Sequence, residues 1–342
     1  MFTDEKSVIR IDQINSKSND VFEKEILRFI NDRIKSVLRK VDPTHFKTLE
    51  EIRLRANKPL IIQNGNGDWM VENDGKLTNM EVCPLMVCQE DIVKSLELMS
   101  ENSIYAYQDE IKNGFITLKG GHRVGLTGRV VLDGSQVKNI KDISGMNIRV
   151  AREVRGCSNK ILPYIVSKRN EIYNTLIVSP PQCGKTTMLR DVAKVLSDGN
   201  INMNLKGVKV GIVDERSEIA ACYKGVAQNM VGVRTDVMDG CPKALGMDLL
   251  LRSMSPQVIV TDEIGNEGDK EAVLRVVNAG VKIITTAHGY NISELKIRRE
   301  VIGLIEQKVF ERYIVLSNSK GPGTVAEIID GMTMEVLIKD VS

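Results

Sequence analysis

The pattern of apolar and polar residues divides the chain into regions with different periodicities. Residues 1–18 are polar and aperiodic, which predicts a disordered tail. From Asn19 to Leu38, apolar residues recur at three-and-four spacing, which predicts one amphipathic helix that packs its apolar stripe into a core. Strands are then predicted at 51–55, 60–62, 69–71, 115–118, 124–132 and 148–150, and helices at 90–100 and 104–111. Because these elements do not alternate regularly, residues 19–152 are predicted to form a small α+β domain.

The second half of the chain has a regular order of strands and helices. A helical connector is predicted over residues 153–172, with its helix at about 159–169, and an α/β domain over residues 173–342. Its strands and helices are predicted in the order 173–178, 185–197, 208–213, 243–254, 257–261, 269–279 and 281–286. The strands are continuous apolar runs, which are typical of parallel strands buried on both faces. Such a core binds its ligands at the carboxyl ends of its strands.

A strand, a tight loop and a helix N-terminus follow one another from Ile177 to Arg190, where the sequence reads I-V-S-P-P-Q-C-G-K-T-T-M-L-R. A phosphate-binding loop needs this order, because the loop N–H groups and the positive helix end then point at one spot. Nucleotide binding is predicted for Pro181, Gln182, Cys183, Gly184, Lys185, Thr186 and Thr187. In this prediction Lys185 contacts the β- and γ-phosphates, and the Thr186 hydroxyl completes a Mg²⁺ shell.

The match to this motif is imperfect at one position. Ser179 stands where the pattern G-x-x-x-x-G-K-[ST] has its first glycine, and serine adopts an ordinary φ but not a relaxed positive one. The alternative interpretation is an ordinary strand, turn and helix that happen to contain Gly-Lys-Thr. The residues that follow the later strands favour phosphate binding.

Asp262 and Glu263 come directly after the apolar strand at 257–261. Asp262 is predicted to hold Mg²⁺ through water. Glu263 is predicted to orient and polarise the water that attacks the γ-phosphate. The alternative interpretation is a solvated acidic loop without a function. The phosphate-binding loop predicted earlier in the chain makes this alternative less favoured.

Further candidates follow the other strands of the core. Glu215 is a second candidate for the water or the metal, or it forms a local ion pair with Arg216. His288 is placed to sense the γ-phosphate, although a lone histidine is more often structural. Arg234 and Arg252 are predicted near the same edge, where they serve either the site or a subunit contact.

Composition narrows the possible functions. Lys and Arg total 47 against 45 Asp and Glu, and aromatic residues make up 4%, so no nucleic-acid partner is expected. The six cysteines are scattered and complete no zinc-binding spacing, which predicts reduced thiols. The N-terminus lacks the order of a signal peptide and no apolar stretch approaches the length of a membrane span. We therefore expect a soluble protein that associates with membranes only through partners.

Four stretches occur in the order found in the ATPases of type II and type IV secretion systems and pilus motors. They are Ser179–Thr187, Val213–Arg216, Val260–Ile264 and Thr285–His288. Longer strings between about residues 50 and 320 resemble the stage III sporulation protein AA family of spore-forming Firmicutes more closely. They lie at 114–118, 121–129, 147–154, 214–220, 232–237, 239–244 and 252–256.

The resemblance implies an α/β fold with a RecA-like P-loop ATPase core and a parallel sheet, preceded by the small α+β N-terminal domain. It implies ATP and Mg²⁺ as ligands, and assembly of the chain with itself into a homo-hexameric ring. In such rings, arginines of the N-terminal domain reach the phosphates, a role that suits bidentate guanidinium groups. Arg123, Arg129 and Arg149 lie on predicted strands in comparable positions; the alternative is a set of surface arginines on an edge strand.

The function implied by the resemblance is that of a cytoplasmic, Mg²⁺-dependent ATPase of the secretion-motor type. It would lie at the inner face of the cell membrane and energise the channel apparatus between mother cell and forespore, with membrane proteins of that apparatus as partners. One alternative is an ATP-gated assembly scaffold with little turnover, because Ser179 and Gln182 stand where the sporulation family usually has glycine. The other is a RecA-like nucleic-acid motor, against which the balanced charge argues.

Overall fold

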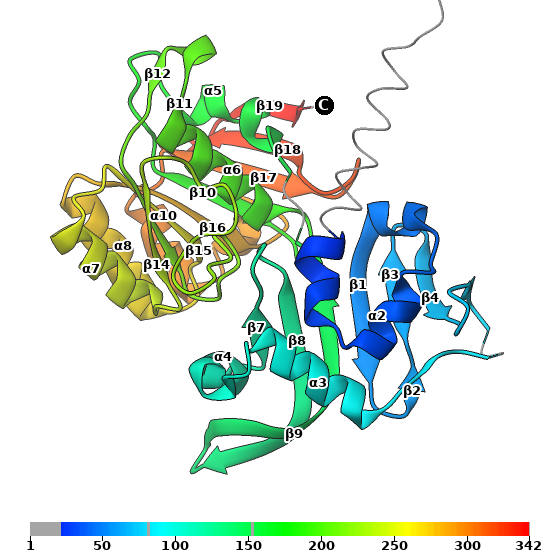
Figure 1. Cartoon of the computed structure of the whole chain (residues 1–342). Coiled ribbons are helices and arrows are strands. Elements are labelled where there is room, and N and C mark those ends of the chain that lie inside the picture. Colours follow the sequence, from blue (N-terminus) through cyan, green and yellow to red (C-terminus); the bar gives the residue numbers. More distant parts are fainter. Residues whose placement is uncertain (1–21, 81–82, 152–153, 342) are drawn as a thin grey trace, which may run out of the picture. The chain divides into compact units, whose positions relative to one another are not determined.

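The computed structural model describes residues 22–80, 83–151 and 154–341. The chain forms two compact units, Met1–Arg152 and Glu153–Ser342 (Figure 1). The tail predicted at residues 1–18 lies outside the described residues.

The N-terminal unit is built on an antiparallel sheet with the strand order β5-β4-β3-β1-β9-β8-β7 (Figure 1). Its strands are β1 (Leu49–Arg55), β3 (Ile61–Asn64), β4 (Gly67–Val71), β5 (Leu77–Thr78), β7 (Phe115–Thr117), β8 (Arg123–Asp133) and β9 (Gln136–Arg149). β2 (Lys58–Pro59) and β6 (Met86–Val87) pair with each other. In β1, Ile52 and Leu54 are buried while Glu51 and Arg53 are partly exposed, so this is the half-buried strand that its alternating sequence predicts.

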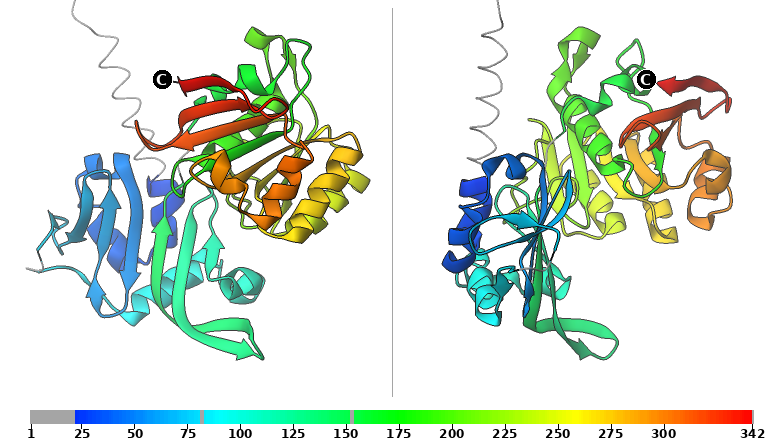
Figure 2. Two further views of the ribbon diagram at one scale, coloured as in Figure 1. Left: turned by 180° about the vertical axis from the view of Figure 1, so that it is seen from behind. Right: turned by 90° about the vertical axis from the view of Figure 1, so that its right-hand side faces the viewer.

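Helices α2 and α3 lie on one face of this sheet, as blue and cyan ribbons in the right-hand view of Figure 2. The helical segments of the unit are η1 (Phe22–Ile26), η2 (Leu27–Phe29), α2 (Asp32–Leu38), η3 (Pro43–Thr48), α3 (Gln89–Met99), η4 (Ile104–Tyr107) and α4 (Gln108–Lys112). The prediction of one continuous helix from Asn19 to Leu38 is wrong, because the backbone becomes extended just before α2 and interrupts the helix.

Asn31 accounts for this break. Its backbone N–H donates to the Oγ of Ser95 at 3.1 Å, and its side-chain oxygen accepts the N–H of Ile34 at 3.0 Å. Its side-chain amide donates to Asp91 at 2.9 Å. Asn31 therefore caps α2 and ties it to α3, and these bonds compete with a continuous helix.

The strand predicted at 148–150 is the end of a longer one. β9 runs for 14 residues and pairs with β8 as far as Asp133 and Gln136. Side chains in the outer part of this ribbon, from Arg129 to Lys141, are exposed or partly exposed. This part therefore lacks the buried apolar run by which strands of the inner sheet are recognised.

The C-terminal unit is built on a sheet with the strand order β14-β13-β15-β16-β10-β17-β18-β19 (Figure 1). Neighbours from β14 to β17 are parallel, and β18 and β19 are added antiparallel. The strands are β10 (Thr175–Ser179), β13 (Val210–Asp214), β14 (Thr235–Asp239), β15 (Val258–Glu263), β16 (Lys282–His288), β17 (Arg312–Ser317), β18 (Thr324–Asp330) and β19 (Val336–Val341). β11 (Gly199–Asn200) and β12 (Leu205–Lys206) form a separate pair. The parallel core is confirmed, whereas the sequence pattern does not predict β14, β17, β18 or β19.

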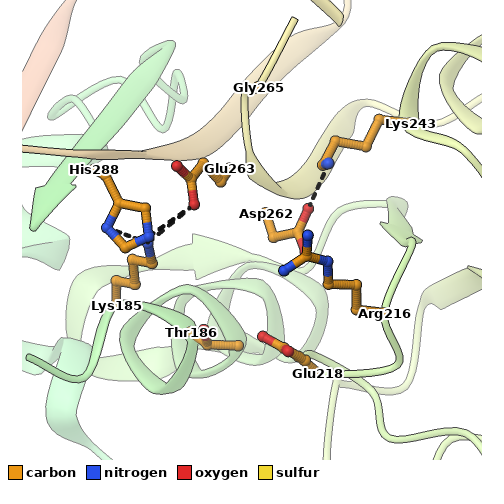
Figure 3. A pocket seen from close by; sticks show the side chains of 9 residues that line it. All are labelled: Lys185, Thr186, Arg216, Glu218, Lys243, Asp262, Glu263, Gly265 and His288. Carbon is orange, nitrogen blue, oxygen red and sulfur yellow. Dashed lines mark hydrogen bonds and ion pairs between the residues drawn. The ribbon is translucent and has the colours of Figure 1, made fainter. Parts of the chain in front are cut away.

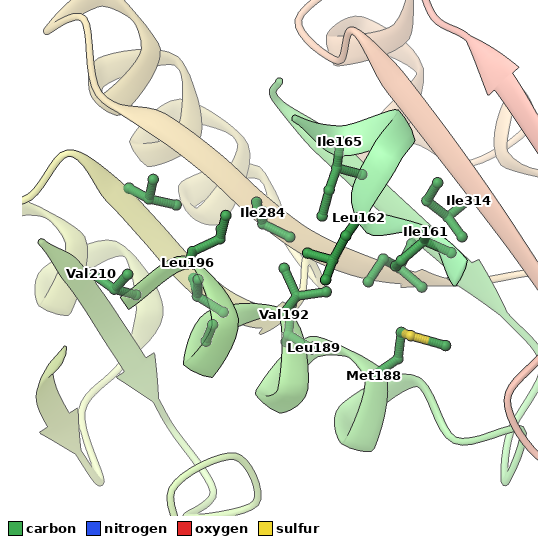
Figure 4. Packing of buried hydrophobic residues seen from close by; sticks show 14 of the residues in the cluster. Ile161, Leu162, Ile165, Met188, Leu189, Val192, Leu196, Val210, Ile284 and Ile314 are labelled. Atoms are coloured by element: carbon green, nitrogen blue, oxygen red, sulfur yellow. The ribbon is translucent and has the colours of Figure 1, made fainter. Parts of the chain in front are cut away.

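Helices cover both faces of this sheet, which explains its continuous apolar strands. They are η5 (Cys157–Lys160), α5 (Leu162–Ile165), α6 (Lys185–Asp198), η6 (Ile201–Met203), α7 (Lys243–Ser253), α8 (Glu267–Asn278), α9 (Ile292–Leu295) and α10 (Arg299–Glu306). On one face, α5 and α6 pack together, and α6 buries Met188, Leu189 and Val192 (Figure 4). On the other, α7 and α8 pack around Met247 and Val273.

The helix predicted at about 159–169 is much shorter in the structure. It consists of η5 and the four-residue α5, which ends at Ile165, and the chain then turns at Asn170 with a φ of 63°. Because Ile161 and Ile165 are fully buried beside α6, this segment is part of the C-terminal core. Across the described ranges, none of the helices is both long and apolar enough to cross a membrane.

Asp91 is the buried charge between α2 and α3. Its side chain is 1% exposed, and it accepts hydrogen bonds from Asn31 at 2.9 Å, from the Arg33 Nε at 2.9 Å and from the Cys88 N–H at 2.8 Å. Burial alone raises the pKa of Asp91, but the hydrogen bonds from Arg33 and Cys88 together lower it further than burial raises it, to about 2.

We predict that this carboxylate makes the N-terminal unit sensitive to acid. Because its folded pKa lies below the ordinary value of 3.8, its stabilisation is complete above that value and is lost as the pH falls toward the folded pKa. The loss amounts to roughly 2 kcal/mol. Urea unfolding followed by the fluorescence of Trp69, the chain's single tryptophan, measures it. Asp91→Asn should remove this part of the pH dependence, and an unchanged slope in the variant would contradict the prediction.

Candidate functional site

The predicted phosphate-binding loop joins β10 to α6. α6 begins directly after Gly184, whose φ is 81°, a left-handed conformation that favours glycine. A Cβ at Gly184 would lie 3.2 Å from the backbone nitrogen of Gly323. The N–H of Gly323 donates to the carbonyl of Cys183 at 2.9 Å. The turn into α6 is therefore held by a second loop of the same unit, and a side chain at Gly184 would be tightly packed against that loop as well as strained by the positive φ.

The two positions that depart from glycine differ in conformation. Ser179 is fully buried at the end of β10, with His288 as its register partner, and its hydroxyl donates to the carbonyl of Pro180 at 2.8 Å. Its φ is not positive. Gln182 is exposed and has a φ of 61°. Of the two, Gln182 is therefore the one in a backbone conformation that glycine would adopt without strain.

A pocket of about 270 Å³ lies at the carboxyl ends of the parallel strands. It is lined by Lys185, Thr186, Arg216, Glu218, Lys243, Asp262, Glu263, Gly265 and His288 (Figure 3). Lys185 and Thr186 come from the first turn of α6, Asp262 and Glu263 end β15, and His288 ends β16. The structure thus brings these five predicted site residues together.

Other predicted loop residues do not line this pocket in the described structure. Pro181 and Gln182 are exposed and Cys183 is buried. The carbonyl of Thr187 accepts the thiol of Cys157 at 3.7 Å. Their contribution to phosphate binding would come through the backbone.

The ammonium of Lys185 lies among the polar groups of two other predicted site residues. It is 3.3 Å from the Oε2 of Glu263, and 3.0 Å and 2.8 Å from the two ring nitrogens of His288. The Oε2 of Glu263 lies 3.0 Å from the Nε2 of His288. Burial lowers the pKa of Lys185, and the Glu263 carboxylate opposes that shift. The lysine predicted to contact phosphates therefore contacts the two residues that are predicted to act at the γ-phosphate.

Asp262 has the properties of a carboxylate that a metal would satisfy. Its Oδ1 is buried and has no hydrogen-bond partner among the described residues. Burial raises the pKa of Asp262 to about 6, and the nearby charge of Lys243 opposes this shift only in part. A buried carboxylate oxygen without a hydrogen-bond partner is costly, and the Lys243 ammonium, 3.5 Å away, compensates its charge only in part, so the residues present fit a hydrated Mg²⁺ beside Thr186. The described residues contain no group of three or more His, Cys, Asp or Glu that could hold a metal, so Mg²⁺ would take most of its ligands from water and phosphate.

Glu215 does not line the pocket in the described structure. Its carboxylate instead accepts a hydrogen bond from the ammonium of Lys243. Sequence reasoning gave Arg216 and Glu218 no role in ligand binding, and it did not assign Lys243 to the pocket. A signal was present, because Arg216 and Glu218 belong to the same polar string as Glu215, and Lys243 opens a predicted helix.

Asp214 shapes the loop that carries these residues. It is fully buried and accepts the backbone N–H groups of Glu218, Ile219 and Ala220 at 2.8, 3.0 and 2.8 Å. Burial raises the pKa of Asp214, and these hydrogen bonds oppose the shift. The turn that they form brings Glu218 back to the pocket.

The predicted placement of Arg234 and Arg252 near this edge is wrong. Arg234 precedes β14, at the amino ends of the parallel strands, and its guanidinium donates to the carbonyl of Ser197 at 2.9 Å. Arg252 lies at the end of α7 away from Lys243, the first residue of that helix.

The three candidate arginines of the N-terminal domain lie on β8 and β9. The guanidinium of Arg123 stacks over the ring of Phe115 at 3.6 Å, and the Nε of Arg149 lies 3.9 Å from a carboxylate oxygen of Glu51. Arg129 is exposed on the outer ribbon. Their contact with phosphates stays a prediction.

Solved structures share this fold at low sequence identity. The chain is similar to the ATPase DotB of Legionella pneumophila, with a TM-score of 0.50, 14% identity and coverage of 78% of this chain and 72% of that one. It is also similar to the pilus retraction motor PilT with bound ADP, with a TM-score of 0.52, 14% identity and coverage of 85% and 77%. These similarities confirm the RecA-like fold predicted for the core.

Sequence comparison places the chain more narrowly. The family model for sporulation stage III, protein AA matches residues 21–336. The chain is 42% identical to stage III sporulation protein AA of Bacillus subtilis over 307 residues, which cover 90% of this chain and 94% of that protein. The chain belongs to the sporulation stage III protein AA family.

Proposed function

We propose that this chain is a Mg²⁺-dependent ATPase of the secretion-motor type. The observation that carries the proposal is the pocket in which the first turn of α6, with Lys185 and Thr186, faces Asp262, Glu263 and His288 (Figure 3). A helix N-terminus with a lysine attracts polyphosphate, and the opposite wall supplies carboxylates for a metal and a water. RecA-like relatives named as an ATPase and a pilus motor support the same reading.

Each side chain then has a distinct role. Lys185 binds the β- and γ-phosphates, and Thr186 and Asp262 hold Mg²⁺, which supplies charge neutralisation at the phosphates. When Lys185 turns to the phosphates, Glu263 loses its 3.3 Å contact with the ammonium and is free to orient the attacking water. His288 loses a contact of 2.8 Å in the same step and so reports the occupied site to β16.

The proposal extends to assembly and place of action. Motors of this type work as rings, and we propose that this chain forms a homo-hexamer in which Arg123, Arg129 and Arg149 of the N-terminal domain contact the phosphates. Hydrolysis would then move the N-terminal domain against the core. Family membership supports action in the cytoplasm, at the inner membrane face, with membrane proteins of the sporulation channel apparatus as partners.

We predict that Glu263→Gln lowers ATP turnover at least about a hundredfold while nucleotide binding persists, because the amide cannot polarise the water. Lys185→Ala should instead abolish binding. Hydrolysis measured against protein concentration, with light scattering for mass, tests both variants. Glu306→Gln, an exposed residue that ends α10, is the matched control. Full turnover by Glu263→Gln in assembled protein would overturn the proposed role.

A second candidate function is an ATP-gated scaffold with little turnover. Two observations favour it: the left-handed φ of 61° at Gln182, and the contacts that hold Lys185, Glu263 and His288 together. The contacts of Lys185 would have to break before phosphates enter, and the strained φ at Gln182 marks a departure from the glycine usual in the family. Tight binding with a single turnover would be its signature.

We predict that reverting the two loop departures changes stability with opposite signs. Gln182→Gly relieves a strained φ and should raise the free energy of unfolding by about 0.5 kcal/mol, whereas Ser179→Gly loses a buried side chain and should lower it by about 1 kcal/mol. Because neither side chain lines the described pocket, ATP binding should change by less than about threefold. Urea unfolding by circular dichroism and nucleotide titration measure both effects. A gain of about tenfold in turnover for Gln182→Gly would favour the scaffold.

A further inference from the structure

Lys243 is a buried lysine at the pocket that the proposed reaction does not use. It is the first residue of α7, and its side chain is 10% exposed. Its ammonium donates to the Oε2 of Glu215. It also lies 3.5 Å from the Oδ1 of Asp262, the ion pair that a dashed line marks in Figure 3. A lysine is rarely buried to this degree unless its charge is paired. The two carboxylates that it faces come from the ends of β13 and β15, so it joins two strands of the core.

The two contacts of Lys243 are unequal. The contact with Glu215 is a hydrogen bond. The Asp262 Oδ1 keeps no hydrogen-bond partner among the described residues, because 3.5 Å is at the limit of a useful bond. Glu215 therefore holds the Lys243 ammonium near Asp262. At this distance the positive charge of Lys243 acts on the Asp262 carboxylate without forming a hydrogen bond to it.

The surroundings make this spacing important. The carboxylates of Asp214, Glu218 and Glu215 all act on Asp262, and Lys243 opposes them. Asp214 is held by backbone N–H groups of its own loop. A divalent cation at Asp262 would meet a strongly negative site that Lys243 offsets in part.

We propose that Glu215 and Lys243 form a positioning pair for the metal site. Glu215 restrains the Lys243 ammonium, so that it competes only partly with Mg²⁺ for the carboxylate of Asp262. The pair thus sets how tightly the metal binds and how readily it leaves. Glu215 then acts through Lys243, and is neither the base nor a metal ligand. This inference rests on the proposed function, because it requires a metal at Asp262.

The test is Mn²⁺ binding to the full-length chain, measured by electron paramagnetic resonance with a saturating non-hydrolysable ATP analogue. Lys243→Gln removes the competing cation, so the Mn²⁺ dissociation constant should fall about tenfold. Glu215→Gln frees Lys243 to bind Asp262 fully, so the constant should rise about tenfold. Lys243→Arg keeps the charge and should stay within about threefold of the wild type. A purely structural role would not move the two Gln variants in opposite directions.

The double variant distinguishes a positioning role from direct metal ligation. If Glu215 acts through Lys243, Glu215→Gln should shift the constant by less than about threefold in the Lys243→Gln background. A full tenfold loss there would make Glu215 a metal ligand and overturn the pair. Weaker or unchanged Mn²⁺ binding by Lys243→Gln would overturn it as well.

Two further comparisons keep the outcome clear. Thermal melting shows whether each variant folds, and if Lys243→Gln does not, Glu215→Gln beside Glu215→Asp carries the test with Lys243 intact. Glu215→Asp should then bind Mn²⁺ more tightly than Glu215→Gln, because it still restrains the lysine.

If the wild type binds no Mn²⁺ with the analogue, the proposed function fails together with the pair. If the wild type binds it and no variant shifts, only the pair fails.

Discussion

The balance of buried charge at one edge of the parallel sheet is the constraint that the pocket of the C-terminal unit has to satisfy. Parallel strands end on the same side, so the polar residues at the ends of β15 and β16 and those that follow β13 meet in one pocket. Carboxylates crowded there would repel one another. Two lysines, Lys185 and Lys243, contact them and so make the arrangement tolerable. Both lysines begin a helix, so the ends of α6 and α7 place these charges.

Core packing keeps these helix ends in place. α6 and α7 lie on opposite faces of the sheet, and each buries apolar side chains in a separate cluster. A shift of either helix would move its first residue and disturb the charge balance. The hydrogen bond from the Gly323 N–H to the carbonyl of Cys183 adds a local restraint at the start of α6. The pocket therefore inherits its geometry from the two clusters more than from the loops that line it.

Much of this arrangement can be predicted from the sequence, and the features that the sequence did not predict have physical causes. Runs such as Leu176-Ile177-Val178 predict the parallel core because burial on both faces imposes one composition. The helix break at Asn31 is not predictable from spacing, because it depends on Asp91 and Ser95, which are distant in the chain. Lys243 was missed for a similar reason: its partners Glu215 and Asp262 meet it only when the strands pair. Local patterns predict elements, whereas contacts between elements decide where an element breaks and which charges meet.

Ligand binding would affect the contacts of Lys185 and Lys243 differently. Lys185 contacts Glu263 and His288, and a phosphate group can reach it only if those contacts give way. Lys243 keeps its hydrogen bond with Glu215, and nothing in a metal's approach to Asp262 requires that bond to break. Under the proposed function, the residues around Lys185 would therefore have to rearrange, whereas the residues proposed to hold the metal would not. If His288 reports that the site is filled, as proposed, then β16, which ends in His288 and pairs with both β10 and β15, would be the strand through which that movement reaches the sheet.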